Sequence, residues 1–285
     1  MIDFINDLQT YAFLQKAFTT SIMVGIICGV IGSFIVLRGM ALMGDAISHA
    51  ILPGVAISYM LGINYFYGAV LTGILTAFGI GAITQNSRIK SDSSIGLVFS
   101  AFFALGIILI NRAKSATDLT QILFGNVLAV RNSDMWLTLA IGGLVLLVVI
   151  IFYKELLVSS FDETMAAAYG LPTRLIHYAI MFLLTLVTVA SLQTVGVILV
   201  VSLLITPAST AYLLTNRLSI MVILSAIFGA MSAVIGLYFS FLYNMPSGPV
   251  IALVTTALFI LAFLFSPKQG LLVRKLKSAN RKKYA

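Results

Sequence analysis

The stretch GMALMGDAISHAILPG, residues 39–54, places polar and helix-breaking residues inside a chain that is otherwise strongly apolar. Asp45 and His49 lie four residues apart, which puts both side chains on one face of a helix, one turn apart. Pro53 follows His49 by four residues and has no N–H, so the His49 carbonyl is expected to lose its helical partner. Because ionisable groups inside a membrane are costly, we interpret this turn as a functional site.

The composition indicates a polytopic helical membrane protein. Of the 285 residues, 60% are hydrophobic and 9% are charged, and the mean hydropathy is +1.10. A soluble domain has roughly 25% charged residues. The apolar residues form blocks of about 20, whereas a β-barrel would have short alternating segments. The expected fold class is therefore all-α.

We expect one transmembrane domain, residues 1–285, with about nine spans. The predicted spans are residues 19–37, 40–61, 65–83, 95–110, 136–153, 175–192, 195–214, 220–243 and 250–265. Residues 1–16 mix apolar and acidic side chains, which is typical of an interfacial segment. Part of 111–134 has a helical pattern too short to span, and we interpret it as a short or re-entrant helix. The very short connection at 193–196 predicts that the spans it joins are antiparallel neighbours.

The distribution of positive charge predicts the orientation. The net charge is +8, and seven of the 17 Lys and Arg residues lie in the tail, residues 267–285. Basic residues collect on the cytoplasmic side near anionic lipids, so we place the C-terminus inside and, with nine spans, the N-terminus outside. Arg112, Lys114 and Arg131 disagree, because this orientation places them outside. Lipid headgroups explain the basic tail, and no nucleic-acid partner is expected.

Motifs for enzymatic chemistry are missing from the sequence. It contains no GxxxxGK, HExxH, GxSxG or CxxC pattern, so it has no P-loop for ATP. Two histidines and one cysteine exclude a multi-histidine or cysteine-based metal site within one chain. We therefore expect no catalytic residue and no permanently bound cofactor.

Spacing alone leaves two interpretations of Asp45 and His49. They form either a pair that fixes helix packing or a site for a cation. A metal ion compensates a buried carboxylate better than a neutral imidazole does, which favours the cation. The neighbours of the pair are also small and leave room for an ion: Gly44, Ala46, Ser48 and Ala50. We interpret His177 as an interfacial histidine and Met43 as a core residue rather than a thioether ligand.

Four segments resemble a known family. They are RGMALMGDAISHAILPGVAISY at 38–59, AKSATDLTQILFGNVLAV at 113–130, SFDETMAAAYGLP at 160–172 and QTVGVILVVSLLITPASTAYLLT at 193–215. In this order they resemble the membrane subunits of ATP-binding cassette importers for manganese, zinc or iron. The resemblance covers nearly the whole chain and is strongest to the manganese permeases of Gram-positive bacteria.

The resemblance implies a fold similar to type II importers in the plasma membrane. It also implies a homodimer, two copies of a separate cytoplasmic ATPase and an extracellular metal-binding lipoprotein. The family's metal-binding residues match Asp45 and His49. Its coupling helix falls in the cytoplasmic loop 154–174, where the expected ATPase-coupling residues are Asp162, Glu163, Met165, Ala166, Ala167, Tyr169 and Gly170. The residues themselves predict a short helix there, because acidic residues begin it and Gly170 ends it.

The expected function is ATP-driven import of a divalent metal ion, with Mn²⁺ preferred and Zn²⁺ or Fe²⁺ as alternatives. Two copies of the chain would supply two carboxylates and two imidazoles, a set that suits Mn²⁺ or Zn²⁺. One rival is a secondary transporter with Asp45 as proton carrier. The others are a membrane metalloprotease, which needs further ligands, and an importer of metal chelates, which needs a wide path without ionisable groups.

Overall fold

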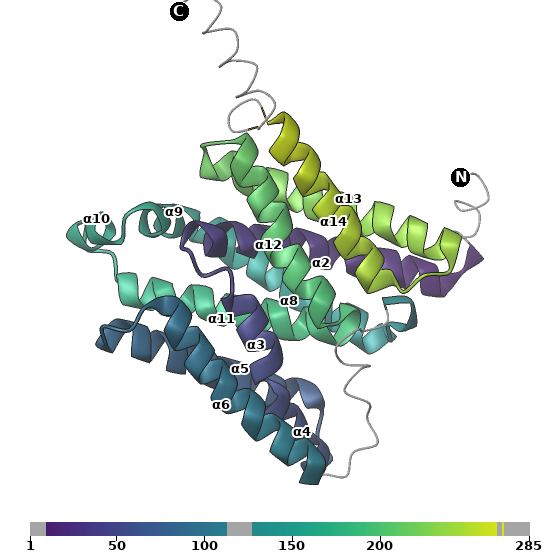
Figure 1. The fold of residues 1–285 in the computed structure, drawn as a ribbon, viewed down its shortest axis with the longest axis horizontal. Helices are drawn as coiled ribbons and strands as arrows, with labels where there is room; N and C mark the ends of the chain where they lie inside the picture. Colours follow the sequence, from purple (N-terminus) through teal and green to yellow (C-terminus); the bar gives the residue numbers. More distant parts are fainter. Residues whose placement is uncertain (1–9, 113–126, 267–269, 271–285) are drawn as a thin grey trace, which may run out of the picture.

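The computed structural model describes residues 10–112, 127–266 and 270, and their regular structure is entirely helical (Figure 1). Eight of the described helices are long and apolar enough to cross a membrane. They are α2 (Ala12–Leu37), α5 (Tyr65–Asn86), α6 (Ser91–Arg112), α8 (Asn132–Ile151), α11 (Thr173–Val195), α12 (Val197–Leu214), α13 (Leu218–Tyr243) and α14 (Ser247–Phe265). The shorter elements are α3 (Met43–Ala50), α4 (Leu52–Leu61), η1 (Val127–Ala129), α9 (Tyr153–Phe161) and α10 (Glu163–Ala168).

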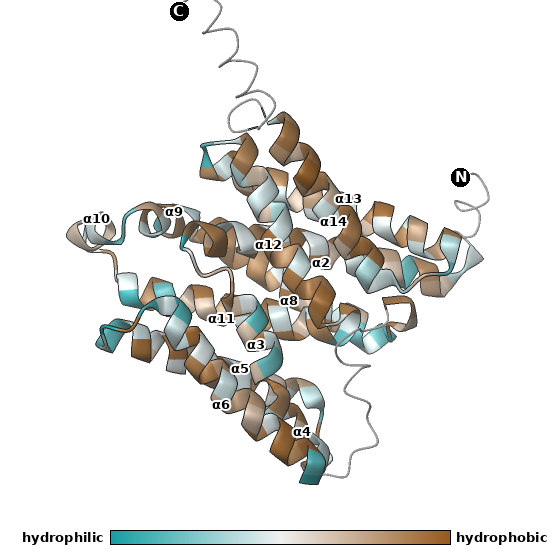
Figure 2. Cartoon of the chain, viewed as in Figure 1, coloured by the Kyte–Doolittle hydropathy of each residue, from teal (hydrophilic) through white to brown (hydrophobic). Residues whose placement is uncertain are grey.

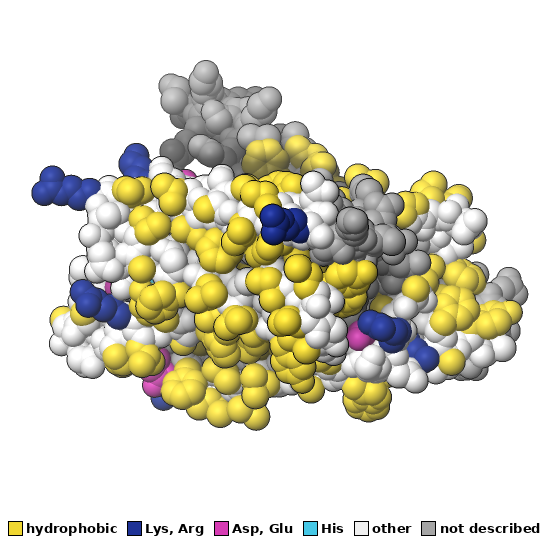
Figure 3. All heavy atoms as spheres, turned by 90° about the horizontal axis from the view of Figure 1, so that it is seen from below, with side chains coloured by type: hydrophobic (Ala, Val, Ile, Leu, Met, Phe, Trp, Pro, Cys, Tyr) yellow, Lys and Arg dark blue, Asp and Glu magenta, His cyan; other side chains and the backbone are white. Residues whose placement is uncertain are grey.

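The surface of the helices fits a lipid environment. The long helices are hydrophobic over most of their length, while hydrophilic residues gather near their ends and in α3 (Figure 2). Hydrophobic side chains cover much of the face in Figure 3, and Lys and Arg lie mostly toward its two ends. Many large apolar side chains are exposed, such as Leu71 at 61% and Ile150 at 75%. Such exposure is stable where lipid, and not water, covers the helices.

The second predicted span, residues 40–61, is not one continuous helix. It consists of α3 and α4, which are joined at Ile51. Neither is long enough to cross a membrane alone, since a span needs about 20 residues. The eight continuous candidate spans therefore correspond to the other eight predicted ones.

The helices pack as two groups, with α3 and α11 between them. In one group α2 lies against α12 and α13, and α14 packs on those two. The other group is α4, α5 and α6. Gly25 allows the close crossing of α2 and α13, because an added Cβ would lie 2.5 Å from the Gly229 carbonyl oxygen. Helix α3 contacts α5 and α6 on one side and α11 and α12 on the other.

Several details differ from the sequence-based expectations. Gly196, with a φ of 83°, joins α11 to α12. The two helices then diverge, because α12 packs on α2, α13 and α14 while α11 packs mainly on α5 and α8. The predicted antiparallel pairing of these spans is thus wrong. Residues 12–16, assigned to the interfacial segment, belong to α2.

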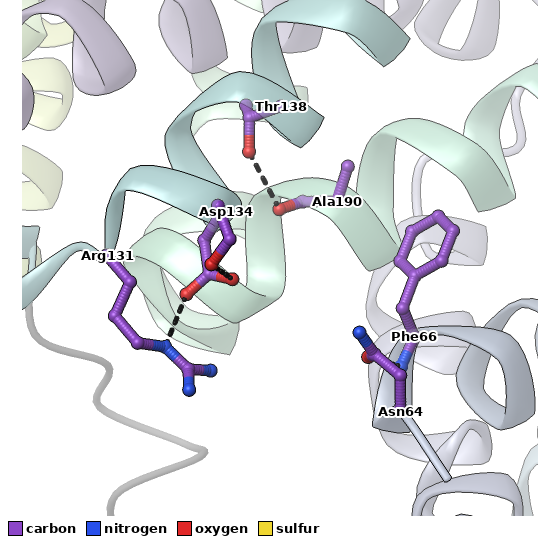
Figure 4. Close-up of polar contacts among 7 residues, drawn as sticks. Asn64, Phe66, Arg131, Asp134, Thr138 and Ala190 are labelled. Atoms are coloured by element: carbon purple, nitrogen blue, oxygen red, sulfur yellow. Dashed lines mark hydrogen bonds and ion pairs between the residues drawn. The ribbon is translucent and has the colours of Figure 1, made fainter.

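Other expectations fall on residues outside the described part of the chain. These are residues 1–9 of the interfacial segment, 113–126 of the linker and nearly all of the 267–285 tail. The described end of the linker contains η1 and an ion pair between Arg131 Nε and Asp134 Oδ2 at 3.0 Å (Figure 4). Arg131 still disagrees with the predicted orientation, because the rule counts Lys and Arg residues and not net charge. Nearby, the Thr138 hydroxyl donates to the Ala190 carbonyl, and Asn64 caps α5.

Candidate metal site

The turn between α2 and α3 holds the candidate ligands in place. Gly39 adopts a φ of 68°, and the Met40 N–H donates to the Ile35 carbonyl at 3.0 Å, which closes the end of α2. Helix α3 starts three residues later. Asp45 lies in its first turn, where the helix dipole favours a carboxylate, and His49 lies in its last turn.

Asp45 and His49 face each other without forming a hydrogen bond. His49 Nε2 and Asp45 Oδ1 are 3.6 Å apart, beyond hydrogen-bond distance. With metal–ligand bonds of about 2.1 Å, two donors on one ion lie about 3.0 Å apart at a right angle and about 3.4 Å at a tetrahedral angle. Small side-chain rotations would bring both atoms onto one ion. The Asp45 side chain is 48% exposed and that of His49 is 23% exposed, so an ion can reach both.

Two phenylalanines of α6 hold the imidazole of His49. The ring meets Phe99 and Phe103 edge-on, with centroid distances of 5.9 and 5.6 Å. The two phenylalanines stack on each other at 5.5 Å. Sequence reasoning missed both, since their one signal is a four-residue spacing in an apolar span that contains many other large side chains. They restrict the orientation of the ring whose Nε2 faces Asp45.

The break after α3 is closed by hydrogen bonds. The Ile51 N–H donates to the Ile47 carbonyl at 3.2 Å. The residue four positions after His49 is Pro53, so the His49 carbonyl lacks its regular helical bond, as expected. The Thr72 hydroxyl of α5 donates to the Ile51 carbonyl at 3.3 Å. Pro53 lies in the first turn of α4, a position that tolerates the missing N–H. Irregular backbone at membrane depth is thereby satisfied inside the protein.

The small residues around the pair allow close packing and do not line an open space. Gly44, Ala46, Ser48 and Ala50 are all buried. An added Cβ at Gly44 would lie 2.7 Å from a methyl group of Leu204 in α12. The described residues contain no group of three or more His, Cys, Asp or Glu side chains that could hold a metal. Among the described residues of one chain, the site therefore consists of Asp45 and His49 alone.

A second predicted segment, α9 and α10, projects at the left of Figure 1. Asp162 caps α10, because its carboxylate accepts bonds from the Thr164 hydroxyl and the Met165 N–H. These bonds, the Thr164 bond first, lower the pKa of the Asp162 carboxyl below its ordinary value. Gly170, with a φ of 80°, follows the helix.

The predicted coupling residues differ in exposure. Met165 and Tyr169 are 50% and 71% exposed. Asp162, Glu163, Ala167 and Gly170 are also exposed. Ala166 is fully buried, so it anchors the helix. The exposed residues of this set remain open to a partner.

The family model described as "ABC 3 transport family" matches residues 10–266. The chain belongs to the ABC 3 transport family. Among relatives of this ABC 3 chain, the manganese transport system membrane protein MntC of Listeria innocua is 66% identical over 274 residues, covering 96% of this chain and 98% of the relative. The manganese import system permease protein ScaB of Streptococcus gordonii is 52% identical over 275 residues, covering 96% and 99%.

Solved structures share the fold of the ABC 3 chain. PsaBC from Streptococcus pneumoniae, in complex with Fab, superposes with a TM-score of 0.86 at 52% identity, covering 97% of this chain and 100% of the matched chain. An inward-facing ABC transporter assigned to the metal-chelate type has a TM-score of 0.70 at 16% identity, covering 90% and 87%. The latter likeness concerns the fold alone.

Met43 and His177 are the two other candidates that the sequence offered in the ABC 3 chain. Met43 is fully buried, in agreement with the core interpretation. His177 lies near the start of α11, and its Nε2 is buried without a hydrogen-bond partner in the described part of the chain. It is thus more enclosed than an interfacial histidine in contact with headgroups.

Proposed function

We propose that this chain is the membrane permease subunit of an ATP-driven importer that carries Mn²⁺ across the plasma membrane. The observation that carries the proposal is the Asp45–His49 pair on a short helix between two helix groups. Oxygen and nitrogen ligands together suit a transition metal better than Mg²⁺ or Ca²⁺. The manganese permeases named above support Mn²⁺ over Zn²⁺ or Fe²⁺.

Two copies of the chain complete the site in this proposal. One carboxylate and one imidazole leave most positions around a divalent ion empty, whereas two pairs supply four ligands. The exposure of Asp45, 48%, supports a site open toward a second protomer. Each protomer holds half of the site, and an ion bound between them is released when the halves separate.

ATP binding and hydrolysis occur on separate cytoplasmic subunits. The sequence contains no P-loop, and the PsaBC likeness supports an ATPase partner. The exposed surface of α10, with Met165 and Tyr169, docks on that partner, and an extracellular lipoprotein delivers the ion. Movement of α9 and α10 opens the path inward. The N-terminus lies outside and the C-terminus in the cytoplasm, in keeping with the basic tail.

The test is Mn²⁺ uptake by cells that express the chain with its ATPase and lipoprotein. Loss of even an indirect partner of a metal ligand costs about 10–100-fold, so Asp45→Asn and His49→Gln should each lower uptake at least tenfold. Asp92→Asn is the control, because this acid is exposed at the start of α6. Variants that reach the membrane with the ATPase and still keep full uptake would refute the site.

The same cells distinguish the importer from a proton-coupled transporter. An ATP-driven importer keeps its uptake when a protonophore collapses the proton gradient while ATP is maintained. It loses uptake when ATP is depleted and the gradient is held. The opposite result would identify Asp45 as a proton carrier.

A further inference from the structure

Arg38 links the metal-site segment to the α9–α10 segment across 121 residues of sequence. It directly follows α2, yet its side chain reaches α9. Its Nη2 donates to the Ser159 hydroxyl at 2.7 Å, and its Nε is 3.3 Å from the Ser160 hydroxyl. Ser159 is buried and the guanidinium is half-buried, so water competes little for these bonds.

On one side, Arg38 caps the end of α2 and is joined to α3 by the short turn 39–42. Its own N–H donates to the Phe34 carbonyl at 3.2 Å, and the Met43 N–H donates to the Met40 carbonyl at 3.0 Å. Met40 and Met43 are buried, with exposures of 6% and 0%. Asp45 follows Met43 by two residues, so only a short turn, held by the two buried methionines, separates Arg38 from Asp45.

On the other side, Arg38 is tied to the segment that leads into α10. Ser160 donates to the Leu156 carbonyl at 2.6 Å, which holds its hydroxyl on α9. Asp162, two residues later, caps α10. Burial lowers the pKa of the Arg38 guanidinium, and the Glu163 carboxylate of α10 acts in the opposite direction. The guanidinium is thus hydrogen-bonded to α9 and attracted electrostatically to the Glu163 carboxylate of α10.

We propose that Arg38 is a positioning residue that transmits movement of α9 and α10 to the metal-site helix α3. This inference rests on the proposed function. The planar guanidinium has several donors in fixed directions and can hold two hydroxyls at once. A rigid joint of this kind forces α3 to follow α9, whereas a loose one lets the ATPase cycle without moving Asp45 and His49.

The test uses the complex of the full chain with its ATPase and lipoprotein, reconstituted in proteoliposomes. The quantity measured is the amount of Mn²⁺ transported for each ATP hydrolysed. Coupling between two sites typically changes a binding affinity by about 5–150-fold. On that scale, Arg38→Gln should lower the amount of Mn²⁺ transported per ATP at least fivefold, with ATP hydrolysis within about twofold of wild type. Arg38→Lys keeps the positive charge but loses the planar set of guanidinium donors, so it should give an intermediate ratio.

Two further variants separate coupling from folding. Ser159→Ala with Ser160→Ala removes the acceptors but keeps Arg38, and it should lower the ratio as Arg38→Gln does, even where that variant fails to assemble. Arg88→Gln is the control, since Arg88 is an exposed arginine on the same expected side of the membrane. It should leave the ratio unchanged.

Two results would overturn the inference. One is an unchanged ratio in the double serine variant. The other is a parallel loss of transport and ATP hydrolysis in the assembled Arg38→Gln complex, because a purely structural anchor would lower both together. Failure of the proposed function would look different, since the wild-type complex would then show no ATP-dependent uptake.

Discussion

The environment of His49 explains how a single helix can present the two proposed ligands. The edge-on contacts to Phe99 and Phe103 limit rotation of the imidazole, and the 3.6 Å separation leaves its Nε2 and the Asp45 carboxylate unbonded to each other. An ion therefore does not have to break a hydrogen bond when it binds. Ligands held ready in this way bind without a large ordering cost.

Removal of one ring should loosen this arrangement. An aromatic contact contributes about 0.5–1.5 kcal/mol, so Phe103→Ala should raise the apparent KM for Mn²⁺ by about threefold to tenfold. The maximal rate should change less, because both ligands remain. The measurement is initial uptake as a function of Mn²⁺ concentration.

Phe263→Ala is the matched control for Phe103→Ala. Phe263 also stacks on a neighbouring phenylalanine, Phe259, but the pair is on α14, away from α3. The Phe263→Ala variant should leave the KM for Mn²⁺ unchanged. An unchanged KM in Phe103→Ala would mean that the ring does not orient His49.

At this scale the sequence predicts local pairs but not distant contacts. The four-residue spacing places Asp45 and His49 on one helix face, as the structure has them. Phe99 is 50 residues beyond His49 and has no polar atom to mark it. The contact of Arg38 with Ser159 likewise depends on how α2 and α9 come together, which no local pattern contains.

Among the helices, the second predicted span shows that a helix-breaking proline predicts a break but not the residue at which the helix ends. Pro53 predicts a disturbed helix, but helix α3 ends at Ala50, three residues earlier. Proline is well accommodated in the first turn of a new helix, so the chain starts α4 just before it. An added Cβ at Gly106 of α6 would lie 3.0 Å from the proline ring, so this glycine leaves room for Pro53. Apolar periodicity alone did not reveal this division.

Gly54 allows α4 to approach α5 closely. An added Cβ would lie 2.0 Å from the Gly68 carbonyl oxygen, so the backbone would have to move. Overpacking costs about 1–3 kcal/mol, and Gly54→Ala should therefore lower the melting temperature of the purified protein in detergent.

Gly96→Ala provides the comparison for Gly54→Ala. No atom lies within 4 Å of a Cβ at Gly96, so there alanine should only improve helix propensity. Its melting temperature should be equal or slightly higher. Equal stability of both variants would contradict the close α4–α5 contact.

The cap of α10 should depend on pH. The pKa of Asp162 is lowered in the folded chain, so its stabilising effect is complete above the ordinary carboxyl value of about 4 and is lost as the pH falls through the lowered value. Amide exchange at Met165, corrected for its intrinsic pH dependence, should show less protection when the pH is below the lowered pKa of Asp162.

The Asp162→Ala variant tests the same cap at neutral pH. Its Met165 amide should exchange faster than in wild type, and Asp162→Ser, which restores a capping oxygen, should recover most of the protection. Equal exchange in Asp162→Ala and wild type would show that the cap does not hold α10.

Across the whole molecule, α3 lies at the boundary between the two helix groups. It contacts α5 and α6 in one direction and α11 and α12 in the other. Hydropathy gives the order of the eight long helices, but it also predicts residues 40–61 as a ninth continuous span, which the structure divides into α3 and α4. Hydropathy does not predict the divergence of α11 and α12, because a one-residue connection permits many crossing angles. Packing of α12 against α2 and of α11 against α5 selects one of them.

The topology can be tested with single cysteines, because the native Cys28 is fully buried and should not react. The Arg38–Ser159 bond places the start of α3 on the same side as α10, so the α3–α4 pair has to cross for Ile63 to lie on the opposite side. Ile63→Cys and Met245→Cys, at exposed positions, should therefore react with an impermeant maleimide in intact cells. Leu42→Cys and Tyr169→Cys should react only after permeabilisation. Reaction of Leu42→Cys from outside would mean that α3 and α4 do not cross, and the ligands would then be placed in a loop on the outer face.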